Sequence, residues 1–290
     1  MELGSIGIWS GALRMGERSA IIEAVQELEE LGYGAVWFPG GGREGLTEHL
    51  HALLGATKRV PFATGIVNIW THSAQDTAAD TVAIQRQYPG RYMLGLGVSH
   101  HMVVERAGLT YEKPLAKMKA YLAEMDGSGS VVPKDQRCLA ALGPLMLKLA
   151  GEKTAGTHPY FVTPEHTRVA REALGPDALV APEQMVVLET DADKARAIAR
   201  QNIGMYLGAP NYTNNLLRLG FTAEDFANGG SDRVVDEIVA WGSPEKVLAR
   251  VNEHHDAGAD HVCVQVLTAD RGQMPREQWR ALSKAAHLAS

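Results

Sequence analysis

The sequence predicts an α/β protein made of a single (β/α)8 barrel, the TIM-barrel fold. In the first hundred residues, short apolar runs alternate with helical patterns at a spacing of roughly thirty residues, the length of a strand plus its helix and return. The run at 92–96 is apolar on both sides of its pleat, as in a parallel sheet covered by helices. The 290 residues are near the roughly 250 typical of such barrels, which favours this fold over an open doubly wound sheet.

The first part of the chain supplies four predicted strands and three predicted helices. Short, mainly apolar runs predict the strands, at 4–9, 35–38, 62–67 and 92–96. Apolar residues at helical spacing predict the helices, at 19–31, 46–55 and 75–87. In the first helix, Ile21, Val25 and Leu28 share one face, and Gly32 marks its end.

The same alternation resumes after residues 127–130, a Gly/Ser segment that we interpret as an exposed loop and not as a domain linker. Further strands are predicted at 137–142, 157–162, 183–188 and 262–266. Helices are predicted at 144–150, from Thr163 onward, and at 191–206, 211–219, 231–240, 244–257 and 275–288. One domain therefore spans 1–290, with a helical insertion around 191–242 between the seventh and eighth strands.

Composition and charge exclude several classes of protein. The 34 acidic and 28 basic residues are mixed along the chain, so no basic stripe is available to follow a nucleic-acid backbone. No apolar run approaches the roughly 20 residues needed to cross a bilayer, and the start lacks the basic and apolar regions of a secretion signal. Cys138 and Cys263 lie in apolar runs, as buried thiols do. We expect a cytoplasmic protein that binds neither nucleic acid nor membrane.

The active site of a (β/α)8 barrel lies at the carboxyl ends of its strands. Residues 95–100 follow the fourth strand and begin like a dinucleotide-binding fingerprint, but His100 stands where the third glycine would be. This segment predicts either a tightly packed strand end or backbone amides and Ser99 beside a planar cofactor. Residues 142–144 pass from a strand into a helix, where free amides and the helix dipole suit a phosphate. A plain turn is the alternative for that segment.

Neither a metal site nor a serine-hydrolase site is expected. The 11 histidines include close pairs, but the chain has no His-Glu-x-x-His and no Cys-x-x-Cys spacing. His254 and His255 are predicted to lie on the exposed face of a helix. Residues 97–101 lack the last glycine of the Gly-x-Ser-x-Gly motif.

Six stretches distributed over nearly the whole chain carry a family resemblance. They are residues 63–70, 88–100, 140–144, 158–168, 211–215 and 257–262. These stretches resemble the bacterial luciferase-like flavin and deazaflavin oxidoreductases, especially the actinobacterial branch described as dependent on coenzyme F420. The resemblance implies a luciferase-like (β/α)8 barrel, in agreement with the alternation of strands and helices.

The resemblance also implies a cofactor site. In deazaflavin members the third strand ends in a non-prolyl cis peptide behind the cofactor ring, and Gly65-Ile66 occupies that place here. The implied cofactor-binding residues lie at the ends of strands and in the segments that follow them. They are Gly65, Ile66, Val67, Asn68, Gly97, Val98, Ser99, Ala141, Leu142, Gly143, Pro144, His158 and Thr163. Of these, residues 142–144 would hold the phosphate.

His100 is the implied catalytic residue, because sugar-phosphate dehydrogenases of the family place an acidic proton donor at about this position. A histidine with a pKa near 6.5 can donate or accept a proton at neutral pH. Its alternative role is to bind the cofactor phosphate or a backbone carbonyl. Those dehydrogenases also carry an Asp-His pair after the second strand, whereas this chain has Pro39-Gly40-Gly41-Gly42. Sugar-phosphate oxidation is therefore not implied.

In function, the resemblance implies an F420-dependent oxidoreductase that moves a hydride between the deazaflavin and a small organic substrate. Two alternatives stay open. One is an FMN-dependent monooxygenase with the same barrel, and the other is a flavin- or deazaflavin-binding protein without turnover. Family members commonly dimerise, so a homodimer is expected, with the apolar faces of the second and third barrel helices as candidate contact surfaces.

Overall fold

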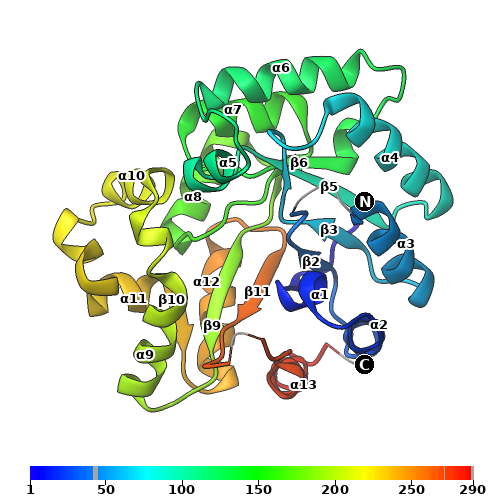
Figure 1. The fold of residues 1–290 in the computed structure, drawn as a ribbon. Helices are drawn as coiled ribbons and strands as arrows, with labels where there is room; N and C mark the ends of the chain where they lie inside the picture. Colours follow the sequence, from blue (N-terminus) through cyan, green and yellow to red (C-terminus); the bar gives the residue numbers. More distant parts are fainter. Residues whose placement is uncertain (42–44, 271, 289–290) are drawn as a thin grey trace.

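The computed structural model describes residues 1–41, 45–270 and 272–288. A curled parallel sheet lies at the centre of the molecule, and helices surround it on the outside (Figure 1). The chain therefore has an α/β fold, as the sequence predicts. Gly42, the last residue of the predicted glycine-rich turn, lies outside the described residues.

The sheet contains 11 parallel strands in the described part of the chain. They are β1 (Ile6–Trp9), β2 (Val36–Phe38), β3 (Phe62–Thr64), β4 (Val67–Asn68), β5 (Tyr92–Gly97), β6 (Arg137–Leu139), β7 (Gly156–Thr157), β8 (Leu179–Val180), β9 (Glu183–Val187), β10 (Val239–Trp241) and β11 (Val262–Val266). Neighbouring strands follow the order β10-β9-β11-β1-β2-β3-β5-β6-β7-β8, and β4 pairs with β5. Because all pairs are parallel, the carboxyl ends of the strands meet at one edge of the sheet.

Helices connect the strands and bury one face each against the sheet or against a neighbouring helix. The α-helices are α1 (Ala12–Met15), α2 (Arg18–Glu30), α3 (Leu46–Ala56), α4 (Ala74–Gln87), α5 (His101–Arg106), α6 (Pro114–Asp126), α7 (Pro144–Lys153), α8 (Pro164–Leu174), α9 (Ala192–Ile203), α10 (Pro210–Arg218), α11 (Asp232–Ile238), α12 (Pro244–Asp256) and α13 (Arg276–Ala285). Short 3-10 helices are η1 (Lys134–Gln136), η2 (Tyr206–Gly208) and η3 (Ala223–Gly229). No helix in the described residues is both long and apolar enough to span a membrane.

Buried side chains from different strands pack together inside the curl of the sheet. Trp37, Ala63, Met93, Cys138 and Cys263 belong to one apolar cluster, and each is almost completely inaccessible to solvent. Both cysteines are free and buried, which confirms the prediction made for them. Side chains packed this closely resist displacement, so they give the site above them a rigid base.

The sixth predicted strand is much shorter than expected. The apolar run at 157–162 predicts a strand throughout, but β7 ends at Thr157. Pro159 has no N–H to donate to a neighbouring strand, and Phe161 has a φ of 61°, which ends extended structure. The main-chain N–H of Phe161 donates instead to Glu183 Oε2, at 3.3 Å. Residues 158 and 159 still form backbone hydrogen bonds with Leu139 and Glu183, and the extended structure ends after them.

The helix predicted at 231–240 ends at Ile238, and the next residues form β10, which pairs with β9. β-Branched and aromatic side chains such as Val239 and Trp241 suit a strand that finds a partner edge. Helices α1, α5 and α6 are further elements that the sequence patterns leave unpredicted.

The prediction that His254 is exposed is wrong. Its side chain is fully buried, and its ring nitrogens lie 2.8 Å from Thr167 Oγ1 and 2.9 Å from Gln184 Oε1. His254 shares the buried face of α12 with Val247 and Val251. A polar side chain on an apolar stripe is tolerated here because both of its nitrogens are hydrogen-bonded.

Candidate functional site

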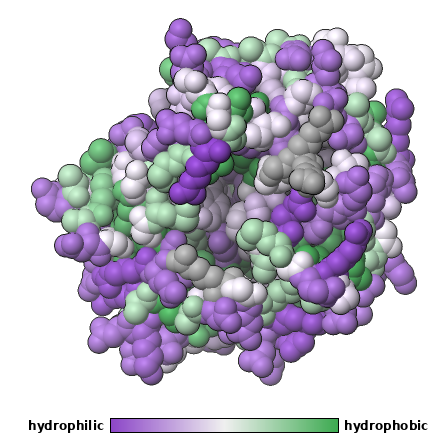
Figure 2. Space-filling view, in the orientation of Figure 1, coloured by the Kyte–Doolittle hydropathy of each residue, from purple (hydrophilic) through white to green (hydrophobic). Residues whose placement is uncertain are grey.

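A cavity of about 420 Å³ opens at the carboxyl ends of the strands. Figure 2 shows the hollow at the middle of this face. The residues around it come from the ends of β1, β2, β3, β5, β6 and β7 and from the helical segments after β9. They are Trp9, Pro39, Gly41, Gly65, Ile66, Asn68, Thr71, Gly97, Val98, Ser99, His100, Val103, Ala107, Ala140, Ala141, Leu142, His158, Tyr160, Tyr206, Asn211 and Tyr212. None of these described residues carries a carboxylate, an ammonium or a guanidinium group.

The cavity brings together most of the residues that the resemblance implies. The implied residues that line it are Gly65, Ile66, Asn68, Gly97, Val98, Ser99, His100, Ala141, Leu142 and His158. The other four do not line it. Val67 is buried in the core and lies opposite Leu96, and Thr163 caps helix α8 by accepting a hydrogen bond from His166 N. Gly143 and Pro144 stand at the start of α7, next to the lining residue Leu142.

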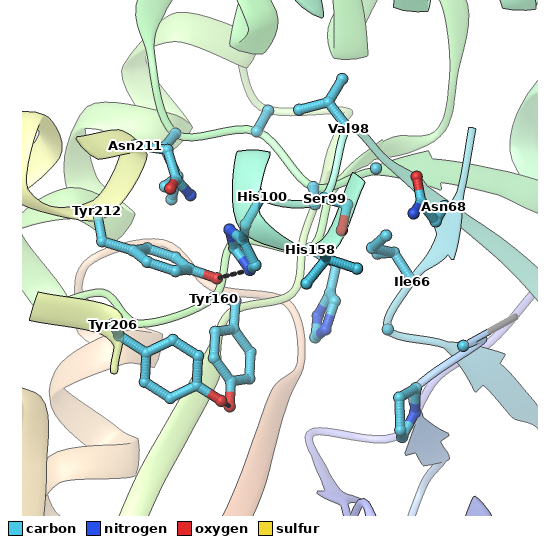
Figure 3. Close-up of a pocket in the computed structure, with 18 of the residues that line it drawn as sticks. Ile66, Asn68, Val98, Ser99, His100, His158, Tyr160, Tyr206, Asn211 and Tyr212 are labelled. Carbon is cyan, nitrogen blue, oxygen red and sulfur yellow. Dashed lines mark hydrogen bonds between the residues drawn. The ribbon is translucent and has the colours of Figure 1, made fainter. Parts of the chain in front are cut away.

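One wall of the cavity is formed by the break between β3 and β4. The Gly65-Ile66 peptide bond is cis, as predicted. The Ile66 side chain packs against β5, where a Cβ added at Gly97 would stand 2.5 Å from Ile66 Cγ1. Glycine at position 97 is therefore required for this close approach. Ser99, two residues later, has a φ of 56°. The turn after β5 thus places Ser99 and His100 at the edge of the same cavity (Figure 3).

His100 is one of the titratable residues that line the cavity. Its Nε2 lies 3.5 Å from the hydroxyl of Tyr212, and the two rings have their centroids 5.2 Å apart (Figure 3). Burial holds the pKa of His100 below its ordinary value, although the side chain of Asn211 acts in the opposite direction. The imidazole is therefore mainly neutral at pH 7, and it can exchange a proton with a ligand.

Aromatic side chains form the part of the lining that lies across from Ile66 (Figure 3). Tyr160 donates to Gln265 Oε1 at 2.9 Å, so the 3.0 Å contact between the Tyr160 and Tyr206 hydroxyls has Tyr206 as its donor. The ring of Tyr212 packs edge-on against that of Tyr206, with centroids 5.4 Å apart. Tyr206 and Tyr212 come from η2 and α10, and no sequence motif assigns them to the site. Tyr212 lies in one of the stretches that carry the resemblance, which is the signal that could have found it.

The floor of the cavity contains His158 and Trp9. The His158 ring stacks on Trp37, with centroids 4.1 Å apart and planes at 19°, and its Nδ1 lies 2.8 Å from the carbonyl oxygen of Ala181. Burial lowers the pKa of His158 to about 4. Neither His158 Nε2 nor Trp9 Nε1 has a hydrogen-bond partner within the described ranges of the chain.

Helix α7 begins at the rim of the cavity. His166 Nε2 lies 3.0 Å from the carbonyl oxygen of Leu142 and holds the segment before the helix in place. A Cβ at Gly143 would stand 3.7 Å from Nη2 of Arg218, an exposed side chain of α10. The side chain of Asn215 is buried. Its Oδ1 accepts a hydrogen bond from Arg218 Nη2 at 3.4 Å, and its Nδ2 has no partner among the described residues. An anion at this helix start would therefore find a positive dipole end and a guanidinium.

No group of three or more His, Cys, Asp or Glu side chains is arranged to hold a metal ion in the described residues. The polar atoms of the cavity are instead single hydroxyl, imidazole, indole and amide groups. Such a lining suits an organic ligand with a few hydrogen-bonding atoms.

Comparison with known proteins identifies relatives of the whole chain. The luciferase-like monooxygenase family model matches residues 5–261. The chain is 25% identical over 287 residues to the 5,10-methylenetetrahydromethanopterin reductase of Archaeoglobus fulgidus, and the match covers 82% of this chain and 86% of that protein.

Two solved structures share the fold at low sequence identity. The coenzyme F420-dependent tetrahydromethanopterin reductase of Methanopyrus kandleri superposes with a TM-score of 0.77 at 17% identity, over 99% of this chain and 100% of that one. The oxygenating constituent of 3,6-diketocamphane monooxygenase from Pseudomonas putida, solved with FMN, gives a TM-score of 0.69 at 14% identity, over 97% of this chain and 96% of that one. These likenesses support the α/β fold with a curled parallel sheet.

Proposed function

The chain belongs to the luciferase-like monooxygenase family, and from this premise we propose that it is a coenzyme F420-dependent oxidoreductase acting on a small organic substrate. It is an enzyme of the flavin and deazaflavin class. One observation carries the proposal: the cavity at the strand ends is uncharged in its described lining and faces His100 on one side and Ile66 on the other (Figure 3). This arrangement offers a largely apolar cavity with the His100 imidazole in its lining.

The residues present fit a planar ring system. Gly65 and Gly97 let the wall pack closely, because Trp9 and His158 fill the space beside Gly65 and Ile66 fills the space beside Gly97. The remaining lining is mostly apolar or aromatic, as in pockets that bury a cofactor ring. The partnerless nitrogens of Trp9 and His158 add hydrogen-bonding positions for such a ring. The Leu142 to Pro144 segment at the start of α7 is the proposed phosphate site, with Arg218 beside it.

The other residues of the site also have proposed roles in the reaction. Bound in the cavity, the deazaflavin would supply the carbon that gives or takes the hydride. Ile66 and Gly97 would orient the ring from one side, and the tyrosines of η2 and α10 would exclude water from the other. His100 would donate or accept the substrate proton on its imidazole, and the Tyr212 hydroxyl, 3.5 Å from Nε2, would orient the ring. Val67 and Thr163 would act indirectly, by fixing β4 and the start of α8.

The proposed substrate is a small, uncharged organic molecule. The described lining offers no ionic partner, whereas it offers several aromatic faces and the hydroxyl of Tyr212. Burying a charged substrate group here would cost its hydration without a counter-charge in return. A carbonyl or conjugated alkene next to an apolar body matches these groups.

We further propose that the sheet closes into the eight-stranded barrel, as one domain with residues 191–242 as an insertion. The segment from β8 to β9 supports closure, because its backbone forms hydrogen bonds with β7 on one side and with β11 on the other. Ala181 N donates to Thr157 O at 2.9 Å on one side, and Cys263 N donates to Pro182 O at 2.9 Å on the other. The two free, buried cysteines support a reducing compartment, and we propose a cytoplasmic protein.

The test is a turnover assay with reduced F420 and a panel of uncharged carbonyl and enone compounds, followed by the absorbance of the oxidised deazaflavin. We expect substrate-dependent oxidation in the absence of oxygen. The second candidate, an FMN-dependent monooxygenase, is favoured by the similarity to the FMN-bound P. putida enzyme. Consumption of oxygen with reduced FMN, and no anaerobic oxidation of reduced F420, would replace the first proposal by the second. A protein that binds a cofactor but is inactive in both assays would contradict both.

A further inference from the structure

Two unpaired nitrogens lie side by side at the floor of the cavity. His158 is 1% exposed and Trp9 is 8% exposed, and both line the cavity. His158 Nε2 and Trp9 Nε1 are buried atoms without a hydrogen-bond partner among the described residues. Buried polar atoms are normally paired, so two partnerless ones at one place mark a position for a ligand.

The hydrogen-bonding character of His158 Nε2 follows from its surroundings. The Ala181 carbonyl can only accept a hydrogen bond, so the 2.8 Å contact places the proton of the ring on Nδ1. Burial keeps the ring neutral at pH 7, because the pKa of His158 falls to about 4. Nε2 therefore carries a lone pair and acts as an acceptor. The stacking on Trp37 fixes the plane of the ring and hence the direction of that lone pair.

Trp9 supplies the complementary group, because an indole Nε1–H can only donate. Its ring packs against Tyr160, with centroids 5.4 Å apart, and this contact limits its rotation. The cavity floor therefore presents one fixed donor and one fixed acceptor.

Gly65 shows that the two nitrogens face the same point. A Cβ added at Gly65 would stand 2.9 Å from His158 Nε2 and would overlap Trp9 Nε1. Both nitrogens are therefore packed against the backbone of Gly65, a residue of the cavity wall, and glycine is required at this position. In the view of Figure 3, the imidazole of His158 lies between Ile66 and Tyr160, at the end of the cavity away from Asn211.

We propose that Trp9 and His158 together bind the pyrimidine edge of the cofactor ring, with Trp9 Nε1–H donating to a ring carbonyl and His158 Nε2 accepting from the adjacent ring N3–H. Flavins and deazaflavins share this edge, in which an N–H stands next to a carbonyl. A donor beside an acceptor complements an acceptor beside a donor, so one rigid ligand satisfies both side chains at once. The inference rests on the proposed function, because it assigns these two residues to the cofactor of that function.

The first experiment titrates purified wild-type protein with F420 and with FMN and follows binding by fluorescence. The Trp9→Phe and His158→Phe variants are then titrated with the cofactor that the wild type binds. Each variant keeps a ring and loses one hydrogen-bonding atom. We expect each to bind the cofactor about three- to tenfold more weakly, the loss that corresponds to one hydrogen bond between neutral groups. Trp279→Phe is the matched control, because Trp279 also has a buried, partnerless Nε1 but lies in α13 outside the cavity. It should bind the cofactor as the wild type does.

The second experiment changes the ligand and leaves the protein intact. The N3-methyl analogue of the same cofactor lacks the N–H that His158 Nε2 would accept. We expect the wild type to bind this analogue at least threefold more weakly than the parent compound. The difference should shrink in His158→Ala, which removes the acceptor and makes room for the methyl group.

The outcomes separate the inference from the proposed function. If the wild type binds neither F420 nor FMN, the proposed function fails and the inference fails with it. If the wild type binds but both Phe variants bind within threefold of it, the pair does not contact the cofactor and the inference alone is overturned. Equal affinity of the wild type for the parent and the N3-methyl compound also overturns it. Melting temperatures identify a variant that fails to fold, and in that case the analogue on wild-type protein decides.

Discussion

A single substitution at His100 tests the proton transfer proposed for the cavity. We expect His100→Ala to lower turnover at saturating cofactor by at least tenfold and to change cofactor affinity by no more than a few-fold, because a group that acts in proton transfer stabilises the transition state. His101→Ala is the matched control, since His101 is the next residue and does not line the cavity. Steady-state kinetics and a cofactor titration on both variants provide the measurement.

The pKa of His100 determines how the rate of the proposed proton transfer depends on pH. Because burial lowers this pKa below 6.5, the neutral imidazole predominates at pH 7. Substrate oxidation needs the neutral form, so its rate should be constant above the pKa and fall as the pH decreases through it. Substrate reduction needs the protonated form, so its rate should rise as the pH decreases.

If His100→Ala weakens cofactor binding but keeps turnover, His100 is a binding residue and the proton donor must be another group.

At the scale of elements, the start of α7 is the most informative segment. Gly143 has a φ of −87°, which any residue can adopt, and a Cβ there makes an ordinary contact with Arg218. We expect Gly143→Asp to weaken cofactor binding at least tenfold, because its carboxylate would repel the phosphate and pair with Arg218. Gly143→Ala should bind almost as the wild type does. Affinity and melting temperature are measured together, and unchanged affinity in a folded Asp variant would place the phosphate elsewhere.

The elements also show what sequence patterns can and cannot predict. The strands β1, β2 and β11 are predicted from short, mainly apolar runs. β7 overlaps only the first residue of the strand predicted at 157–162, and β8, with two residues, is too short for any periodicity to be visible. β10 continues the apolar spacing of α11, so sequence alone extends that helix through it. Only the neighbouring strand β9 makes the extended conformation favourable there.

The residues of the site also divide into those that the sequence predicts and those that it does not. The glycine-containing strand end predicts the segment from Gly97 to His100, and the family resemblance implies Gly65. The contribution of Trp9, Tyr160 and Tyr206 depends on tertiary contacts, and no local pattern reveals it. Trp9 belongs to the first strand and Tyr206 to a short helix almost two hundred residues later.

At the scale of the whole molecule, buried titratable groups predict a stability maximum near pH 6.5. Burial lowers the pKa of His158, His166 and His261 to about 4 and that of His254 to about 3. The unfolded chain binds protons at these groups below about pH 6.5 and the folded chain does not, so stability falls as the pH decreases from there to the folded pKa. Each group contributes a slope of about 1.4 kcal/mol per pH unit.

Glu183 acts in the opposite direction. Burial raises the pKa of Glu183 to about 8, so the folded chain keeps a proton that the unfolded chain releases above about pH 4.3. Stability from this group falls as the pH rises toward 8, whereas four histidines outweigh it below pH 6.5. Melting temperature should therefore decline on both sides of about pH 6.5, more steeply on the acid side. Glu183→Gln should flatten the alkaline side, and an unchanged alkaline decline in that variant would refute this assignment.

The homodimer stays a prediction, and its contact surface needs revision. The apolar side chains of α3, including Leu50, Leu53 and Leu54, pack into the core of the same chain, so they are not free to form a contact between subunits. Exposed apolar side chains gather on other segments, such as Leu145 of α7 and Leu217 of α10. Light scattering at micromolar concentration should give twice the mass of one chain. A monomeric mass would remove the dimer from the account.

The central claim is that the cavity at the strand ends holds F420. The most direct measurement is a pair of equilibrium titrations of the wild-type protein, one with F420 and one with FMN, under identical conditions and followed by fluorescence. If the cavity holds F420, the dissociation constant for F420 should lie in the micromolar range or below, with clearly weaker binding of FMN. Equally weak binding of both compounds, or tighter binding of FMN, would contradict it.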